Sequence, residues 1–261
     1  MRRRDMLKGA LAGGALSWLP FSTVDAKAKS APVLVVVELS GGNDGLNTVV
    51  PYRDDAYYRL RPTIGIKQNE LIKLDDDYGL NPGMTGFKSL WDNNELAIVH
   101  GCGYEQPSYS HFTSMAYWQT GAPNRGDEYG WLGRVADAMK PTISEDMIIN
   151  VGSSQSLAVK SAVHTPLVFD DPMRFQRDRW MNQMQVSDGK DLDVNNSNQE
   201  FLRAVDVSAN LSAKRIRQAW SDYKTPVDYG IAPIDLPKVA SCISAGLGTQ
   251  LYYVSFRNNA F

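Results

Sequence analysis

Two short stretches of the sequence carry side chains suited to catalysis or metal binding, and the first is SGGNDGLN (40–47), which directly follows an apolar run. It offers a carboxylate, Asp44, and an amide, Asn47, whose oxygens are ligands that hard divalent cations prefer. Its glycine spacing is neither that of a dinucleotide-binding loop nor that of a phosphate-binding P-loop. Two interpretations stay open: a site for a cation or a polarised substrate oxygen, or a tight turn in which Asp44 caps the next helix.

The second stretch is SHFTSMAYWQTG (110–121), in which apolar residues recur at helical spacing up to Gly121, a natural helix end. Ser110 and His111 therefore fall at a helix N-terminus, where exposed amides and the positive end of the dipole favour an anion. A hydroxyl beside an imidazole at such a place suits a nucleophile with a polar helper. The alternative is an ordinary capping serine followed by a structural histidine.

The elements that position these residues follow from the apolar pattern. Short aliphatic runs that stop at glycine or a small polar residue predict strands over 32–39, 96–101, 147–152 and 250–255. Helices are expected over about 83–93, 111–121, 131–140, 200–222 and 237–246. This alternation predicts an α/β fold with a mostly parallel central sheet flanked by helices. Because ligands gather at the carboxyl ends of such strands, loops 40–47 and 101–112 are where chemistry is expected.

The two ends of this α/β region differ in pattern from its middle. The first residues are cationic, then comes a weakly apolar, Gly/Ala-rich stretch, and Val24-Asp25-Ala26 is a plausible cleavage site. Arg3 and Arg4 fit the twin-arginine pattern, so residues 1–26 are expected to be an export signal and 27–261 the α/β domain, located in the periplasm or secreted. Within it, about 155–235 is less regular and is expected to be a peripheral insertion.

Composition excludes several classes of protein. The chain has 261 residues, 43% of them hydrophobic, and a net charge of −2 without basic blocks beyond its first residues, so a nucleic-acid partner is not expected. No apolar run approaches the ~20 residues that cross a bilayer, so no stable membrane insertion is expected. Cys102 and Cys242 lack metal-ligand spacing, and either pair as a disulfide or are small buried residues.

Several sequence blocks, in a fixed order, closely resemble a large bacterial family of exported proteins of unknown function within the alkaline phosphatase and sulfatase superfamily. The blocks are VVVELSGGNDGLNTVVPY (35–52), RPTIGI (61–66), GLNP (79–82), LAIVHGCGY (96–104), SHFTSMAYWQTG (110–121), GWLGR (130–134) and AGLGTQLYYVSF (245–256). The resemblance implies an alkaline-phosphatase-like α/β fold with two divalent cations, zinc, calcium or magnesium. It also implies hydrolysis of a phosphate or sulfate ester, on a small molecule or a glycan, after export by the twin-arginine translocase.

Carried onto this chain, the resemblance assigns roles to particular residues. Asp44 is similar to the first-strand metal ligand, with Asn47 or Glu38 as companions. The ending WQTG (118–121) resembles the W-S-T-G of the nucleophile helix in alkaline phosphatases, which puts the nucleophile at Ser110 or, without a one-residue gap, at His111. Two cations in such a site would lower the pKa of the nucleophile and hold the entering and leaving oxygens.

The C-terminus departs from the family pattern. In relatives the strand similar to 251–256 continues into Gly-Gly-Phe-Asp-Thr-His and later Asp-His-Gly, which supply further ligands, whereas this chain ends at Phe261. The resemblance therefore implies a C-terminally truncated member with an incomplete metal centre and impaired activity. The alternative function is a non-catalytic periplasmic or surface binding protein that retains the fold.

Overall fold

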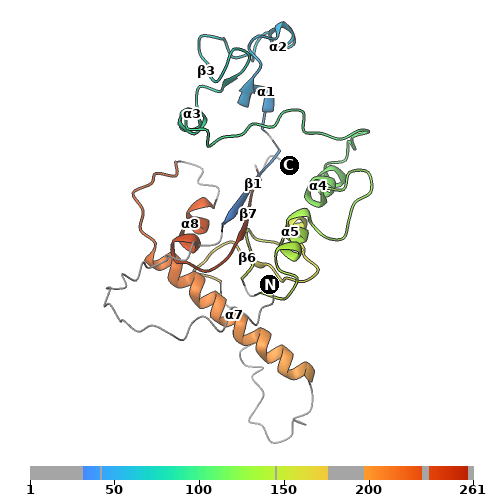
Figure 1. Ribbon diagram of the computed structural model, residues 1–261, viewed down its shortest axis with the longest axis vertical. Helices are drawn as coiled ribbons and strands as arrows, with labels where there is room; N and C mark the ends of the chain where they lie inside the picture. Colours follow the sequence, from blue (N-terminus) through green and yellow to red (C-terminus); the bar gives the residue numbers. More distant parts are fainter. Residues whose placement is uncertain (1–31, 42, 145, 176–196, 231–234, 258–261) are drawn as a thin grey trace, which may run out of the picture. The chain divides into compact units, whose positions relative to one another are not determined.

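The computed structural model describes residues 32–261 apart from 42, 145, 176–196, 231–234 and 258–261, so the expected export signal lies outside the described residues. The predicted α/β class is confirmed. A parallel four-stranded sheet has the order β1-β7-β5-β6, and helices flank it (Figure 1). Its strands are β1 (Leu34–Ser40), β7 (Leu251–Arg257), β5 (Ile148–Val151) and β6 (Leu167–Phe169).

Both faces of β5 and β7 are covered, which explains why these two strands are almost continuously apolar. Alternate residues of β7 point to opposite faces: Tyr252 and Val254 belong to one buried cluster, Leu251 and Tyr253 to the other. The first cluster contains apolar residues of α7 (Ser197–Asp222) and α8 (Leu236–Ser244). The second contains residues of α5 (Trp131–Met139) and the 3-10 helix η1 (Leu157–Val159).

Two expectations need correction. Residues 155–235 are not merely a peripheral insertion, because they supply β6 to the main sheet and Ile216 of α7, 1% exposed, to its core. The strand predicted over 96–101 is absent: the segment has no regular secondary structure, and Val99 is 77% exposed. Its apolar composition suits a strand, but none of the described strands pairs with it, and a strand forms only by pairing with another.

A second, three-stranded antiparallel sheet, unanticipated from the sequence, follows β1 along the chain. It has the order β2-β4-β3 and consists of β2 (Val49–Val50), β4 (Gly79–Leu80) and β3 (Ile72–Lys73). A small core of Val50, Tyr52 and Tyr57 stabilises this region. The accompanying helices are α1 (Gly45–Thr48), α2 (Asp55–Leu60) and α3 (Thr85–Asp92). The segment that follows β1 along the chain therefore has a small core of its own.

The predicted helix over 111–121 is confirmed as α4 (His111–Thr120), and both of its ends follow from the sequence. The Ser110 side chain caps its N-terminus, and Gly121 ends it with φ 60°, a left-handed conformation that glycine adopts without strain. Within the described ranges no helix is long and apolar enough to cross a membrane.

Candidate functional site

Helix α4 runs antiparallel to β1 on the face of the sheet that α5 also covers. Gln119 Nε2 lies 3.4 Å from Glu38 Oε2, and the Ser40 hydroxyl lies 3.9 Å from the sulfur of Met115. Moving toward the carboxyl end of β1 therefore means moving toward the N-terminus of α4. The four-residue step from Met115 to Gln119 along α4 and the two-residue step from Glu38 to Ser40 along β1 have similar lengths, about 6 Å each. The N-terminus of α4, with its cap Ser110, thus lies toward the carboxyl edge of the sheet.

Glu38 is the polar centre of this helix–sheet contact. Its carboxylate accepts hydrogen bonds from the hydroxyls of Tyr253 and Ser255 on β7, the latter at 3.0 Å, and from the Gln119 amide. Tyr253 is 1% exposed, and its burial and its bond to Glu38 both raise its pKa. From the family resemblance, Glu38 was expected only as a companion ligand of Asp44. The sequence feature that could have identified Glu38 as a polar centre is that it is the one carboxylate within an aliphatic run, 32–39.

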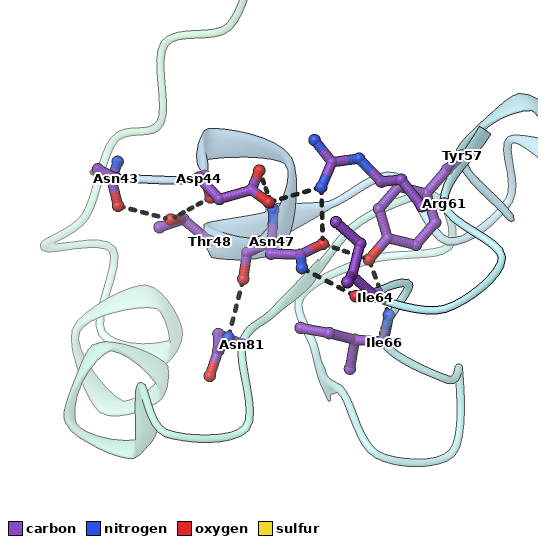
Figure 2. Close-up of polar contacts among 9 residues, drawn as sticks. All are labelled: Asn43, Asp44, Asn47, Thr48, Tyr57, Arg61, Ile64, Ile66 and Asn81. Atoms are coloured by element: carbon purple, nitrogen blue, oxygen red, sulfur yellow. Dashed lines mark hydrogen bonds and ion pairs between the residues drawn. The ribbon is translucent and has the colours of Figure 1, made fainter. Parts of the chain in front are cut away.

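Asp44 is both a helix cap and one partner of an ion pair (Figure 2). Its Oδ1 accepts a hydrogen bond from the backbone N–H of Asn47 at 3.3 Å, and its Oδ2 lies 2.5 Å from Arg61 Nη1. The hydrogen bond from Arg61 is the main reason why the pKa of Asp44 is lowered. The capping interpretation of Asp44 is therefore confirmed, and its negative charge is balanced by a neighbouring cation.

The Asn47 side chain holds the loop after α2 (Figure 2). Its Oδ1 accepts a hydrogen bond from the Tyr57 hydroxyl at 2.6 Å, and its Nδ2 donates to the Ile64 carbonyl at 2.9 Å. The same Tyr57 oxygen accepts from the N–H of Ile66 at 2.8 Å. Asn81 also donates to the backbone carbonyl of Asn47, at 2.9 Å. Asn47 therefore connects the polar loop to the small sheet and has both ends of its amide engaged.

Ser110 and His111 are exposed at the start of α4. The Ser110 oxygen accepts a hydrogen bond from the N–H of Thr113 at 3.4 Å, and a hydroxyl that accepts in this way can still donate its proton. Between described residues, no hydrogen bond or ion pair joins Ser110 to Asp44 or Asn47. The structure therefore does not bring the side chains of the two predicted groups into contact.

The implied pair of divalent cations can be tested against the side chains present. Over the residues that the structure describes, no three His, Cys, Asp or Glu side chains come together as a metal cluster. The Asp44 carboxylate is paired with Arg61, and the oxygen and the nitrogen of the Asn47 amide each have a hydrogen-bond partner. The described residues therefore do not form a complete dinuclear centre. For Asp44 to bind a cation, its contact with Arg61 has to be exchanged for that cation.

The two cysteines are separate thiols. Cys102 is exposed in the loop before α4, and Cys242 is buried in α8. Of the two interpretations left open by the sequence, the disulfide is therefore wrong for this structure, and burial is confirmed for Cys242 alone. Burial also raises the pKa of Cys242 to about 11.

Comparison of the chain with protein-family profiles, with curated proteins and with solved structures gave no match.

Proposed function

We propose that this chain is an exported, metal-dependent hydrolase-like protein of the alkaline phosphatase and sulfatase class, acting on phosphate or sulfate esters. The observation that carries the proposal is the antiparallel register of α4 and β1. Because Gln119 contacts Glu38 and Met115 contacts Ser40, the Ser110 end of α4 and the loop with Asp44 both extend from the carboxyl edge of one parallel sheet. Active sites of α/β proteins gather at that edge.

The residues of α4 suit an anionic ester. The first amides of a helix have no partner within it, and the positive end of the helix dipole favours a phosphate or sulfate group. Ser110 offers a hydroxyl at this end, and His111 an imidazole beside it. In the proposal Ser110 or His111 either positions the ester or attacks its phosphorus or sulfur atom and displaces the alcohol. Asp44 would hold a divalent cation in place of its contact with Arg61. The remaining ligands of that cation are not assigned.

The proposed substrate is a small-molecule ester or a sulfated or phosphorylated glycan. The proposed location is the periplasm or the exterior of the cell, reached through the twin-arginine translocase. Support for this part comes from the sequence of residues 1–26 and from the family resemblance.

Hydrolysis of arylphosphate and arylsulfate esters tests the proposal. The chain without residues 1–26 would be assayed with zinc, calcium or magnesium added in turn, beside Asp44→Ala and Ser110→Ala. Ser144→Ala is a matched control, since Ser144 lies in the loop after α5 rather than at the start of α4. We expect metal-dependent turnover that falls at least tenfold in the first two variants and stays unchanged in the control. Turnover unaffected by either change would contradict the assignment.

A second candidate is a non-catalytic binding protein that retains the fold. It is favoured by the Asp44–Arg61 ion pair and by the engaged Asn47 amide, because both proposed ligands already have partners within the chain. Isothermal titration calorimetry with the same esters separates the candidates. Ester binding without turnover at any metal concentration supports the binding protein, whereas turnover excludes it.

A further inference from the structure

The segment that leads into α4 is fastened to the helix through the side chain of Tyr104. The aromatic ring of Tyr104 packs edge-on against two rings of α4, with its centroid 5.8 Å from that of Tyr117 and 6.4 Å from that of Trp118. Its hydroxyl oxygen lies 3.0 Å from the hydroxyl oxygen of Ser114, which also belongs to α4. The ring and the hydroxyl of Tyr104 therefore both contact the helix.

Ser108, two residues before the cap of α4, has a partner for both of its backbone polar groups. Its N–H donates to the Tyr104 hydroxyl at 3.4 Å, and its carbonyl accepts from the Ser114 hydroxyl at 2.7 Å. Because a serine hydroxyl has one proton, and that of Ser114 goes to this carbonyl, the Tyr104 hydroxyl donates to Ser114. The three bonds form a closed cycle, here called the hydroxyl clamp, in which each hydroxyl donates once and accepts once.

The hydroxyl clamp reaches Ser110 from two sides. On the loop side, the Ser108 hydroxyl oxygen accepts a hydrogen bond from the N–H of Ser110 at 3.2 Å. On the helix side, the carbonyl of Ser110 accepts from the N–H of Ser114 at 2.9 Å. Two of the three clamp residues therefore bond directly to Ser110. A displacement of Ser108 changes the place of the Ser110 hydroxyl relative to the first amides of α4.

Hydrogen bonds rather than apolar contacts hold Ser110 in place. The neighbouring side chains of Tyr109 and Phe112 are 97% and 90% exposed, so they add little packing at this point. The clamp residues are half-buried, whereas Ser110 itself is exposed to an approaching ester. The position of a reacting group matters for the rate, because a misplacement of about 1 Å can cost roughly 100-fold. The bonds around Ser110 therefore decide how well its hydroxyl is oriented.

We propose that Tyr104, Ser108 and Ser114 are positioning residues, which hold the Ser110 hydroxyl in the orientation that faces an ester at the start of α4. None of the three touches the ester, and each acts through Ser110. The hydroxyls of Tyr104 and Ser114 fix the backbone of Ser108, and the Ser108 side chain transmits this to Ser110. The kinetic consequence rests on the proposed hydrolase function, whereas the effect of the hydroxyl clamp on Ser110 itself does not.

Amide hydrogen exchange measured by NMR tests the hydroxyl clamp without any substrate. The readout is the N–H of Ser110, whose acceptor is Ser108 and not the hydroxyl that is removed. We expect it to exchange about fivefold faster or more in Tyr104→Phe and Ser114→Ala, and at the parent rate in Ser114→Thr, which keeps a hydroxyl. Tyr223→Phe is the matched control, because it removes one hydroxyl from another pair, 2.9 Å from that of Tyr229. Equal exchange in Tyr104→Phe and the parent chain would overturn the proposal.

Steady-state kinetics of arylphosphate and arylsulfate hydrolysis tests the consequence for the site. Tyr104→Phe and Ser114→Ala should lower kcat by about fivefold or more and leave KM within about twofold, because the orientation of Ser110 changes while the amides that bind the ester remain. Ser114→Thr should restore kcat, and Tyr223→Phe should match the parent. An unchanged kcat of Tyr104→Phe in an active chain would contradict the positioning role. If the parent chain hydrolyses neither ester, the proposed hydrolase function is wrong, and the exchange of the Ser110 amide alone decides whether the clamp positions Ser110.

Discussion

Arg61 Nη1 lies 2.5 Å from Asp44 Oδ2, so the carboxylate that the family resemblance marks as a metal ligand forms an ion pair with the chain's own guanidinium. Both residues belong to the region that follows β1, and Asn47, between them in sequence, bonds to the loop after α2. The pair therefore helps to hold the polar loop in its present form. It also makes Arg61 a competitor of any cation that approaches Asp44.

Replacing Arg61 by Gln should raise the pKa of Asp44, because the guanidinium is the main cause of its lowering. A carboxylate with a lowered pKa stabilises the fold above its ordinary pKa, about 3.9, and this contribution is lost as the pH falls through the folded-state value. The stability difference between parent and variant should therefore be largest near neutral pH and vanish in acid. Carboxyl-carbon NMR titration follows Asp44 directly, and an unchanged pKa would disprove the electrostatic role of Arg61.

Removal of the Glu38 carboxylate should destabilise the helix–sheet contact. Glu38→Ala leaves the hydroxyl of Tyr253, 1% exposed, without this acceptor, and an unsatisfied buried group costs about 1–3 kcal/mol. Glu38→Gln keeps an acceptor oxygen and should lose less. Urea denaturation of the two variants measures the difference, and an unchanged stability of Glu38→Ala would show that the hydrogen bonds of Glu38 are unimportant.

Two helical glycines should respond in opposite ways to alanine. A Cβ on Gly133 of α5 would lie 2.1 Å from the backbone oxygen of Lys160, so Gly133→Ala forces α5 away from the segment after η1 and should cost about 1–3 kcal/mol. A Cβ on Gly86 of α3 meets no atom within 4 Å, and Gly86→Ala should stabilise by about 0.5–1 kcal/mol. Thermal unfolding measures both. A stabilising Gly133→Ala would contradict the close packing.

The two thiols should differ sharply in reactivity. Cys102 is exposed, whereas burial of Cys242 raises its pKa to about 11, so little of it is the reactive thiolate at pH 8. Iodoacetamide should label one cysteine in the folded chain and both after denaturation. Raising the pH toward 11 increases the thiolate fraction of Cys242. Its labelling should increase only if iodoacetamide also reaches the buried thiol. Peptide mass spectrometry locates the labels, and early labelling of Cys242 would show that α8 is not packed as described.

Local signals predicted much of the fold. Ser110 and Gly121 marked both ends of α4, because capping and left-handed glycine are properties of single residues. The strands β1, β5 and β7 were also predicted, because a short aliphatic run is likewise a local property of the sequence. The strand predicted over 96–101 was wrong for this structure, since strand formation also needs a partner that composition does not specify.

The candidate site was predicted less completely than the fold. Sequence spacing singled out Asp44 and Asn47, but Arg61 and Tyr57, which engage them, lie ten or more positions away and meet them only through the small sheet. Glu38 and Tyr253 are further apart still, and the parallel pairing of β1 with β7 brings them together. Long-range contacts of this kind have no local pattern.

The proposed activity is hydrolysis of phosphate or sulfate esters at the carboxyl edge of the sheet, and the rate of arylester hydrolysis with and without a divalent cation tests it most directly. For the chain without residues 1–26, we predict turnover that requires the cation and falls at least tenfold in Ser110→Ala, while Ser144→Ala matches the parent. Cation-independent turnover, or full activity in Ser110→Ala and Asp44→Ala, would contradict the claim.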